Sequence, residues 1–371
     1  METKRVVIKI GSSSLTNKDG TLSLKKLQQY SEAVSSLMDQ GIEVVLISSG
    51  AVSAGFRDLG YSSRPVTVSG KQAAAAVGQG LLIKAYNDFF KKLGYVSAQL
   101  LLTRDVFRNE IQFSNVYQTI RELLKRRVIP IINENDSVAT DELTFGDNDM
   151  LSALVSGLVN ADLLIILTDI DGIYRENPRT HPMSAKIDYL PHISDALINQ
   201  MSAESGSKVG TGGMKSKLLA AQKATSLGVR CFIGLAEQQE ALRLVIKGNG
   251  TGSYIGSEEA VHVRKQKQWI AFHSQVSGRV FIDDGAKQAI ELEGKSLLPI
   301  GIVALEGEFN KDDVVEIYYH HQLLAKGQIN YSNGQLQQIR GLNSHEASKL
   351  IKGTKAEAIH RNKLILTTQG V

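Results

Sequence analysis

The chain of 371 residues has a single cysteine, Cys231. One cysteine cannot form an intrachain disulfide, and it excludes a metal site built from several thiolates. The chain also has no apolar run near the roughly twenty residues that a membrane helix needs. Its first ten residues do not resemble a secretory signal. We therefore expect a protein of the reducing cytoplasm that does not enter a membrane.

Histidine is missing from the first 180 residues, because all eight histidines lie from His181 onward. A histidine general base or a histidine metal site in the first half of the chain is therefore disfavoured. Two nucleotide-binding motifs are absent as well. Gly294-Lys295-Ser296 is not a Walker P-loop, since Ala289 stands where the first glycine of that motif is required. No GxGxxG sequence opens the first strand-to-helix turn, which disfavours a dinucleotide site.

Basic residues are absent from residues 128–174, although this segment is rich in carboxylates. Two segments within it, Val128–Ile132 and Leu163–Leu167, have the pattern of buried strands. Charge of one sign beside buried strands suggests a site for cations: a metal ion, an ammonium group or lysines from elsewhere in the chain. A solvated acidic loop is the alternative. The nine carboxylates are Glu134, Asp136, Asp141, Glu142, Asp147, Asp149, Asp162, Asp169 and Asp171.

Short β-branched segments alternate with helical segments over the first two-thirds of the chain. Nearly continuous apolar strands separated by helices indicate an α/β fold with a mainly parallel sheet covered on both faces, a three-layer αβα sandwich. The expected strands are Arg5–Ile10, Glu43–Ser48, Tyr95–Leu101, Val128–Ile132, Leu163–Leu167 and Arg230–Leu235. The expected helices are Ser23–Gln40, Lys71–Leu93, Asn115–Arg127, Asp149–Asn160 and Met214–Leu227.

The pattern changes after residue 256. Residues 257–274 include a Lys- and Gln-rich stretch and are expected to link a first domain, residues 1–256, to a second, residues 275–355. The second domain is expected to be small and rich in β-strands. Its expected strands are Gly278–Asp283, Asp313–Tyr319 and Leu324–Tyr331. Its expected helix, Asn343–Ile351, begins with a cap in which Glu346 follows Asn343 by three residues.

Polar or glycine-rich residues follow four of the expected strands. In parallel α/β sheets, ligands bind beyond the carboxyl ends of the strands. Four such ends on one rim therefore suggest a single binding crevice. The ends are Gly11-Ser12-Ser13-Ser14, Ser48-Ser49-Gly50-Ala51, Asn133-Glu134-Asn135-Asp136 and Thr168-Asp169-Ile170-Asp171-Gly172.

Two lysines occupy unusual positions. Lys9 lies within the apolar first strand, where an unpaired ammonium group is costly; an edge strand with Lys9 in water is the alternative. Lys217 lies in the first turn of the helix that begins near Met214, where a cation opposes the helix dipole unless an anion is bound. The glycine-rich turn before this helix, residues 210–213, would favour a phosphate. The pattern indicates two ammonium groups over phosphate oxygens.

Two lysines, many carboxylates and no histidine base point to phosphoryl transfer, where catalysis is mostly positioning and charge neutralisation. An acceptor that is itself a carboxylate is already ionised at neutral pH and needs no base. Magnesium would bridge the phosphates, held by one or two carboxylates and by water. The residues alone therefore predict phosphoryl transfer to a small anionic or zwitterionic acceptor.

Five motifs together resemble the glutamate 5-kinases of the amino acid kinase superfamily, over nearly the whole chain. They are Lys9-Ile10-Gly11-Ser12, Ser48-Ser49-Gly50-Ala51-Val52, Ile132-Asn133-Glu134-Asn135-Asp136, Gly146-Asp147-Asn148-Asp149 and Thr211-Gly212-Gly213-Met214. The tail resembles a PUA domain, whose start matches Ser296-Leu297-Leu298-Pro299-Ile300-Gly301. The resemblance implies phosphorylation of the side-chain carboxylate of L-glutamate to L-glutamyl 5-phosphate, with ATP and Mg2+, as the first step of proline biosynthesis.

The resemblance also implies roles for individual residues. Lys9 and Lys217 would contact the transferring phosphate, and Asp149 would orient both lysines. Glutamate would be held by Ser49, Gly50, Ala51, Asn133, Asp136, Asp147 and Asn148. The ATP-binding site would be lined by Lys9, Gly11, Ser12, Thr168, Asp169, Thr211, Gly212, Gly213, Met214, Lys215, Ser216 and Lys217. No dedicated metal ligands are implied, because magnesium is expected mainly on nucleotide phosphates and water.

Two alternatives stay open. A related kinase could act on aspartate, N-acetylglutamate or UMP, although the tail argues against aspartate kinases. The tail could instead make the chain an RNA-binding protein, but residues 262–371 hold 14 Lys and Arg against 11 Asp and Glu, a net charge of +3. That net positive charge is small for a domain that binds RNA. A homo-oligomer, either a dimer or a tetramer, and transfer of the labile product to a glutamate-5-phosphate reductase are further expectations.

Overall fold

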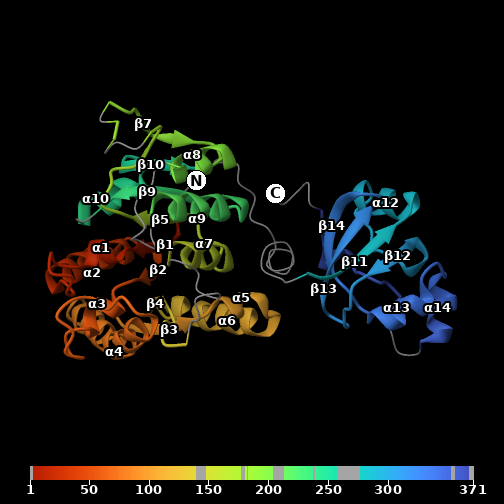
Figure 1. Cartoon of the computed structure of the whole chain (residues 1–371), viewed down its shortest axis with the longest axis horizontal. Coiled ribbons are helices and arrows are strands. Elements are labelled where there is room, and N and C mark those ends of the chain that lie inside the picture. The colour runs from red at the N-terminus through yellow and green to blue at the C-terminus, as the bar shows by residue number, and fades with distance from the viewer. Residues whose placement is uncertain are drawn as a thin grey trace. The chain divides into compact units, whose positions relative to one another are not determined.

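The computed structural model describes residues 3–138, 148–176, 180–181, 183–203, 213–236, 239–256, 276–351 and 356–366 (Figure 1). The chain divides into two compact units, one around each of its two larger sheets. Among the helices of the described segments, none is long and apolar enough to cross a membrane.

The first unit is built on an eight-stranded sheet in the order β3-β4-β2-β1-β5-β9-β10-β8. The ladders from β3 to β9 are parallel, whereas β10 runs antiparallel to β9. All six predicted strands are confirmed, with β3 beginning at Ser97 rather than Tyr95. The strands are β1 (Arg5–Ile10), β2 (Glu43–Ser48), β3 (Ser97–Leu102), β4 (Ile129–Glu134), β5 (Leu163–Leu167), β8 (Tyr189–Leu190), β9 (Arg230–Leu235) and β10 (Thr251–Ile255).

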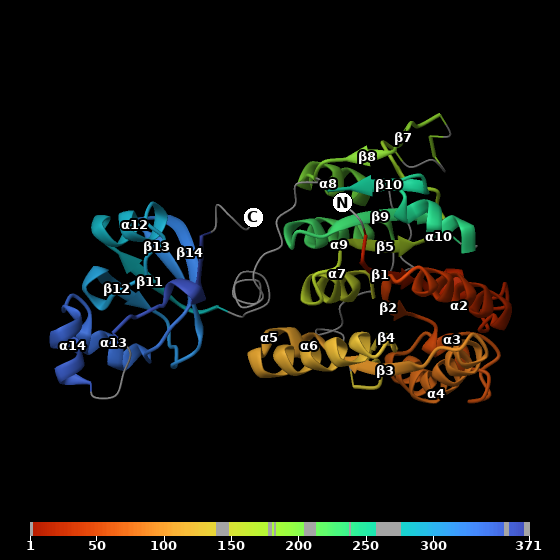
Figure 2. The same ribbon diagram turned by 180° about the vertical axis from the view of Figure 1, so that it is seen from behind.

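Helices cover both faces of this sheet, which confirms the predicted three-layer sandwich. α2 (Leu24–Asp39), α4 (Val68–Lys92) and α10 (Gln239–Ile246) share one apolar core with the strands. α7 (Asn148–Leu158) and α9 (Met214–Ser226) pack against β1, β5 and β9. Figures 1 and 2 both show α7 and α9 on the other side of the strands from α2 and α10.

The structure corrects several predicted boundaries and adds short elements. The helix expected over Asn115–Arg127 is α6 (Glu110–Lys125), which begins five residues earlier and follows a separate short helix, α5 (Arg104–Arg108). Sequence reasoning missed short elements in this unit. They are α1 (Ser12–Leu15), α3 (Ala51–Gly55), α8 (Asp195–Ala203), β6 (Ile173–Tyr174) and β7 (Lys186–Ile187), together with α10, β8 and β10.

The alternation of side chains along β1 decides which face receives its lysine. Val6, Ile8 and Ile10 belong to the core shared with α2. Because successive side chains of a strand point to opposite faces, Lys9 points toward the face covered by α7 and α9. The alternative of an edge strand is wrong, since β1 pairs with β2 on one side and with β5 on the other.

The second unit is a five-stranded sheet, β12-β11-β13-β14-β15, with a core of its own. The predicted cap is confirmed: the Glu346 N–H donates to Asn343 Oδ1 at 3.0 Å, and the Asn343 N–H donates to Glu346 Oε2 at 3.2 Å. The strand expected to reach Tyr331 ends at Gln328, because the chain turns into a helix capped by Ser332. The predicted linker, residues 257–274, lies outside the described residues.

The elements of this unit are β11 (Val276–Ile282), α12 (Asp284–Glu291), β12 (Ile302–Glu306), β13 (Val314–Tyr319), β14 (Gln322–Gln328), α13 (Asn333–Ile339), α14 (Ser344–Leu350) and β15 (Leu364–Leu366). Sequence reasoning missed β12, β15, α12 and α13. The β-rich character of the tail is confirmed.

Helices α3 and α4 pack backbone to backbone through glycine. A Cβ atom on Gly78 would lie 1.9 Å from the carbonyl oxygen of Ala51, and a Cβ atom on Gly55 would lie 2.4 Å from the Gly78 nitrogen. No side chain fits at these distances. The preceding turn also needs glycine, because Gly50 has a φ of 106°. The contact therefore fixes the segment that follows β2, which carries Ser49.

We expect Gly78→Ala to lower the free energy of unfolding by at least about 1–3 kcal/mol, since the added methyl group must push α3 and α4 apart. Gly80→Ala on the same helix is the matched control: a Cβ atom there meets nothing within 4 Å, and the gain in helix propensity is worth up to about 1 kcal/mol. Urea unfolding followed by circular dichroism measures both. Equal stabilities for the two variants would contradict the packing argument.

Candidate active site

The four strand ends singled out in the sequence lie next to one another. β4, β2, β1 and β5 are consecutive neighbours in the sheet, and all four run parallel. Their carboxyl ends therefore form one continuous rim. Residues that are far apart in the chain, such as Ser49, Asn133 and Thr168, reach the same edge of the sheet, which is where ligands bind in folds of this kind.

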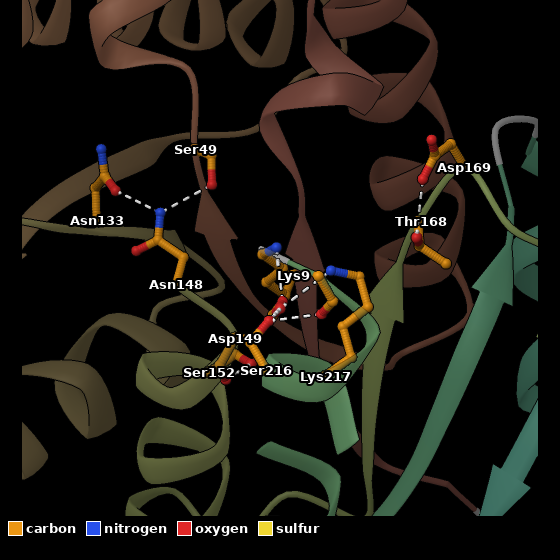
Figure 3. A network of polar contacts seen from close by, with 11 residues as sticks. Lys9, Ser49, Asn133, Asn148, Asp149, Ser152, Thr168, Asp169, Ser216 and Lys217 are labelled. Atoms are coloured by element: carbon orange, nitrogen blue, oxygen red, sulfur yellow. Dashed lines mark hydrogen bonds and ion pairs between the residues drawn. The ribbon is translucent and has the colours of Figure 1, made fainter. Parts of the chain in front are cut away.

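Two lysines share one carboxylate at this rim (Figure 3). Lys9 Nζ lies 2.6 Å from Asp149 Oδ1, and Lys217 Nζ lies 3.1 Å from Asp149 Oδ2. All three residues are buried, with exposed fractions of 2% for Lys9, 0% for Asp149 and 7% for Lys217. The structure thus brings together the three residues that the sequence selected for phosphate chemistry, from β1, α7 and α9.

Two serines help to place Asp149. Its carboxylate lies in the first turn of α7, where a negative charge suits the helix dipole. The Ser216 hydroxyl lies 2.9 Å from Asp149 Oδ2 and 2.8 Å from the Gly213 carbonyl oxygen, so its single proton has two acceptors. The Ser152 hydroxyl donates to the Asp149 backbone carbonyl at 2.5 Å. Sequence reasoning missed Ser152, because a serine inside a helix carries no motif.

Two ammonium groups face the Asp149 carboxylate in a place that water scarcely reaches. An incoming anion would therefore gain more here than at an exposed surface. Burial and the negative charge of Asp149 raise the pKa of the nearby Cys231 thiol well above its ordinary range, which disfavours a thiolate there.

Small residues leave room for an anion beside the lysines. A Cβ atom on Gly11 would lie 3.5 Å from Lys9 Nζ, in van der Waals contact, so a larger side chain there would occupy the space beside the ammonium group. Ser12 follows at the start of α1. Gly213 precedes α9 and offers no side-chain cap to the first amides of that helix, and amides at a helix N-terminus favour an anion. Met214, Lys215 and Ser216 form the first turn of α9; the predicted Thr211 and Gly212 lie outside the described residues.

A second network lies over β2 and β4. Asn148 Nδ2 donates to Ser49 Oγ and to Asn133 Oδ1, both at 2.9 Å (Figure 3). Asn133 Nδ2 in turn donates to Gln79 Oε1 on α4 at 2.9 Å. Gln79 was missed from the sequence because it lies within the long helix α4, far from every motif. Gly50 and Ala51 follow Ser49 in the turn into α3.

Asp136 adds a partly buried carboxylate to this side of the rim. Burial raises the pKa of Asp136, and the positive charge of Arg64 lowers it in part. Because burial destabilises the charged form of Asp136, a second cation besides Arg64 would stabilise that form. An ammonium group of a ligand would supply such a charge. The predicted Asp147 lies outside the described residues.

Thr168 and Asp169 occupy the other end of the rim, after β5. The Thr168 hydroxyl donates to Asp169 Oδ1 at 3.2 Å, and the Thr168 N–H donates to the Gly234 carbonyl oxygen at 3.1 Å. In Figure 3 this pair and the network of Asn133, Asn148 and Ser49 lie on opposite sides of Lys9. The structure thus separates the residues predicted for the nucleotide from those predicted for the acceptor, with the lysines between them.

The chain belongs to the amino acid kinase family, whose model matches residues 4–234. A PUA domain model matches residues 278–351. The resemblance seen in the motifs is thereby confirmed, because curated relatives over nearly the whole length are named glutamate 5-kinase.

Three of these relatives are bacterial. Glutamate 5-kinase of Halalkalibacterium halodurans is 53% identical over 367 residues, which cover 99% of this chain and 98% of the relative. Glutamate 5-kinase 1 of Bacillus licheniformis is 52% identical over 362 residues, 98% of both chains. Glutamate 5-kinase 1 of Bacillus subtilis is 51% identical over 362 residues, again 98% of both chains.

Replacing the shared carboxylate should cost stability. We expect Asp149→Asn to lower the free energy of unfolding by about 3–5 kcal/mol, because two buried ammonium groups lose their counter-charge. Asp88→Asn is the control: Asp88 forms an exposed ion pair with Lys84 at 2.7 Å, and exposed pairs contribute little. Urea unfolding of both variants tests the contrast. A loss no greater for Asp149→Asn than for Asp88→Asn would contradict the shared-carboxylate geometry.

Proposed function

We infer that the protein is a glutamate 5-kinase, which transfers the terminal phosphoryl group of ATP to the side-chain carboxylate of L-glutamate in the first step of proline biosynthesis. Relatives named for this activity are about half identical over nearly the full length. The observation that carries the chemistry is the pair of buried ammonium groups on Asp149 at the strand rim. It supplies what phosphoryl transfer needs, which is positioning and neutralisation of charge.

The proposed mechanism uses no general base. The acceptor carboxylate is ionised at neutral pH, so it attacks without losing a proton. Lys9 and Lys217 are proposed to contact the transferring phosphoryl group and to neutralise the negative charge that gathers on its oxygens. Asp149 holds both ammonium groups in place before substrate arrives, so little reorganisation is needed during the reaction.

The two sides of the rim are proposed to bind the two substrates. Glutamate is proposed to bind Ser49, Gly50, Ala51, Asn133, Asp136, Asp147 and Asn148. The nucleotide is proposed to bind Gly11, Ser12, Thr168, Asp169 and residues 211–217. The separation of Thr168 from Asn148 across Lys9 supports this division (Figure 3).

Magnesium is proposed to bind through the nucleotide phosphates and water. Over the residues that the structure describes, no group of three His, Cys, Asp or Glu side chains is placed to hold a metal ion. Asp149 is already engaged by two lysines. When bound with the nucleotide, the ion would neutralise phosphate charge.

Further properties are proposed from the activity. The acyl phosphate product is labile, so we propose that a glutamate-5-phosphate reductase takes it up directly. We also propose that the enzyme works in the cytoplasm as a homo-oligomer, a dimer or a tetramer, with domain limits near residues 256 and 275. RNA binding by the tail is a second candidate function, favoured by the PUA domain match to residues 278–351.

Acceptor choice can be measured by coupled ADP release with glutamate, aspartate, N-acetylglutamate and UMP. We expect glutamate to have the highest kcat/KM. We also expect aspartate, one methylene shorter, to be about 10–200-fold worse. Turnover with another acceptor but none with glutamate would contradict the assignment. Tight, salt-sensitive RNA binding by a full-length chain that phosphorylates none of the four would favour the second function.

Lys217→Ala should lower kcat by at least about 100-fold while it changes either KM far less, because an ammonium group that acts on the transition state contributes little to ground-state binding. Lys91→Ala is the control, since Lys91 is an exposed lysine at the end of α4. Steady-state kinetics with both substrates varied checks the expectation. An unchanged kcat for Lys217→Ala would remove this residue from the mechanism.

A further inference from the structure

A buried relay of carboxamide side chains connects α4 to the acceptor side of the site. Gln79 on α4 is 9% exposed and Asn133 on β4 is 2% exposed. Asn133 Nδ2 donates to Gln79 Oε1, and Asn148 Nδ2 donates to Asn133 Oδ1, each at 2.9 Å. Asn148 Nδ2 also donates to Ser49 Oγ. The relay therefore leads from Gln79, within α4, to the side chains at the rim that are proposed to bind glutamate.

One backbone group sets the direction of every hydrogen bond in this relay. The Glu134 N–H can only donate, and it donates to Asn133 Oδ1 at 2.9 Å. Asn133 Nδ2 must then point the other way, toward Gln79, which presents its oxygen. If the Asn133 carboxamide were turned by 180°, its Nδ2 would face the Glu134 N–H, and two donors would face each other without an acceptor. Gln79 favours the observed orientation, because without it Asn133 Nδ2 would be buried without an acceptor.

The orientation of Asn133 determines that of Asn148. Because Asn133 presents oxygen, Asn148 presents nitrogen, and Asn148 Oδ1 is left buried without a hydrogen-bond partner in the described part of the chain. Ser49 Oγ accepts from Asn148, so the Ser49 hydroxyl proton is available to another acceptor. Among the residues that the structure describes, the relay thus ends in one acceptor, Asn148 Oδ1, and one donor, the Ser49 hydroxyl, that no other side chain of the relay uses. An α-amino acid offers the complementary groups, an ammonium and a carboxylate.

We propose that Gln79 is a positioning residue of the acceptor site. It acts through Asn133 to hold the Asn148 carboxamide with its oxygen toward the ammonium group of the substrate, and Gln79 itself does not touch the substrate. This inference rests on the proposed function, because it takes an α-amino acid as the acceptor. A glutamine that only packed within α4 would affect stability and would not distinguish one substrate from the other.

The test compares two substitutions in the full-length enzyme. Gln79→Leu removes the acceptor at similar size, and we expect it to raise the KM for glutamate about tenfold, as for one lost hydrogen bond. The KM for ATP should stay within about twofold of the wild-type value. Gln79→Glu keeps an acceptor oxygen at the same place, so it should hold the KM for glutamate within about threefold. Should Gln79→Leu not fold, Gln79→Met carries the same expectation.

Tyr86→Phe controls for a general disturbance of α4. Tyr86 lies on the same helix and shares a buried hydrogen bond of 2.9 Å with Ser48. Its loss should lower the thermal midpoint and leave the KM for glutamate within about twofold. Equal rises of the glutamate KM in the Leu and Glu variants, parallel rises for both substrates, or no rise at all would each overturn the proposal.

The same assay separates this proposal from the function on which it rests. A wild-type enzyme that does not phosphorylate glutamate would contradict the proposed function and this inference together. A wild-type enzyme that phosphorylates glutamate, with Gln79→Leu kinetically unchanged, would contradict only the role of Gln79.

Discussion

The ion pairs between Asp149 and two lysines are the interaction on which the rest of the site depends. A buried ammonium group is costly alone, and here two of them share one carboxylate. The pairing requires that β1, α7 and α9 meet at one point. The packing of the first unit brings these three elements together. The same arrangement that stabilises the fold also holds two ammonium groups at the rim, where they attract an anion.

The strand order and the alternation of side chains together place Lys9 where the phosphate is expected to bind. β1 lies between β2 and β5, so Lys9 is not on an edge strand that would expose it to solvent. Its neighbours Ile8 and Ile10 point into the opposite core, so a shift of one residue in register would bury the ammonium among aliphatic side chains. The register is therefore strongly determined by the apolar residues, and the position of Lys9 follows from it.

The sequence predicted the six main strands, the layered architecture and the meeting of Lys9 with Lys217 near carboxylates. These followed from long apolar patterns and from residue types that are costly to bury without a partner. Short elements such as α3 were missed, because five residues show no period. The closeness of α3 and α4 depends on Gly55 and Gly78 meeting in space, and nothing in their spacing along the chain indicates it. Gln79 was missed for the same reason, since its partner is 54 positions away.

Asn148 and Asn133 belong to the network over β2 and β4 that is proposed to bind the acceptor, whereas Asp149 pairs with the two lysines. Asn148 and Asp149 are consecutive residues at the start of α7, so a single peptide unit joins the two halves of the site. A displacement of either side chain by its ligand would be transmitted to the other through rigid helix backbone. The occupancy of one half would then alter the affinity of the other, and thermodynamic linkage makes that cooperativity equal in both directions.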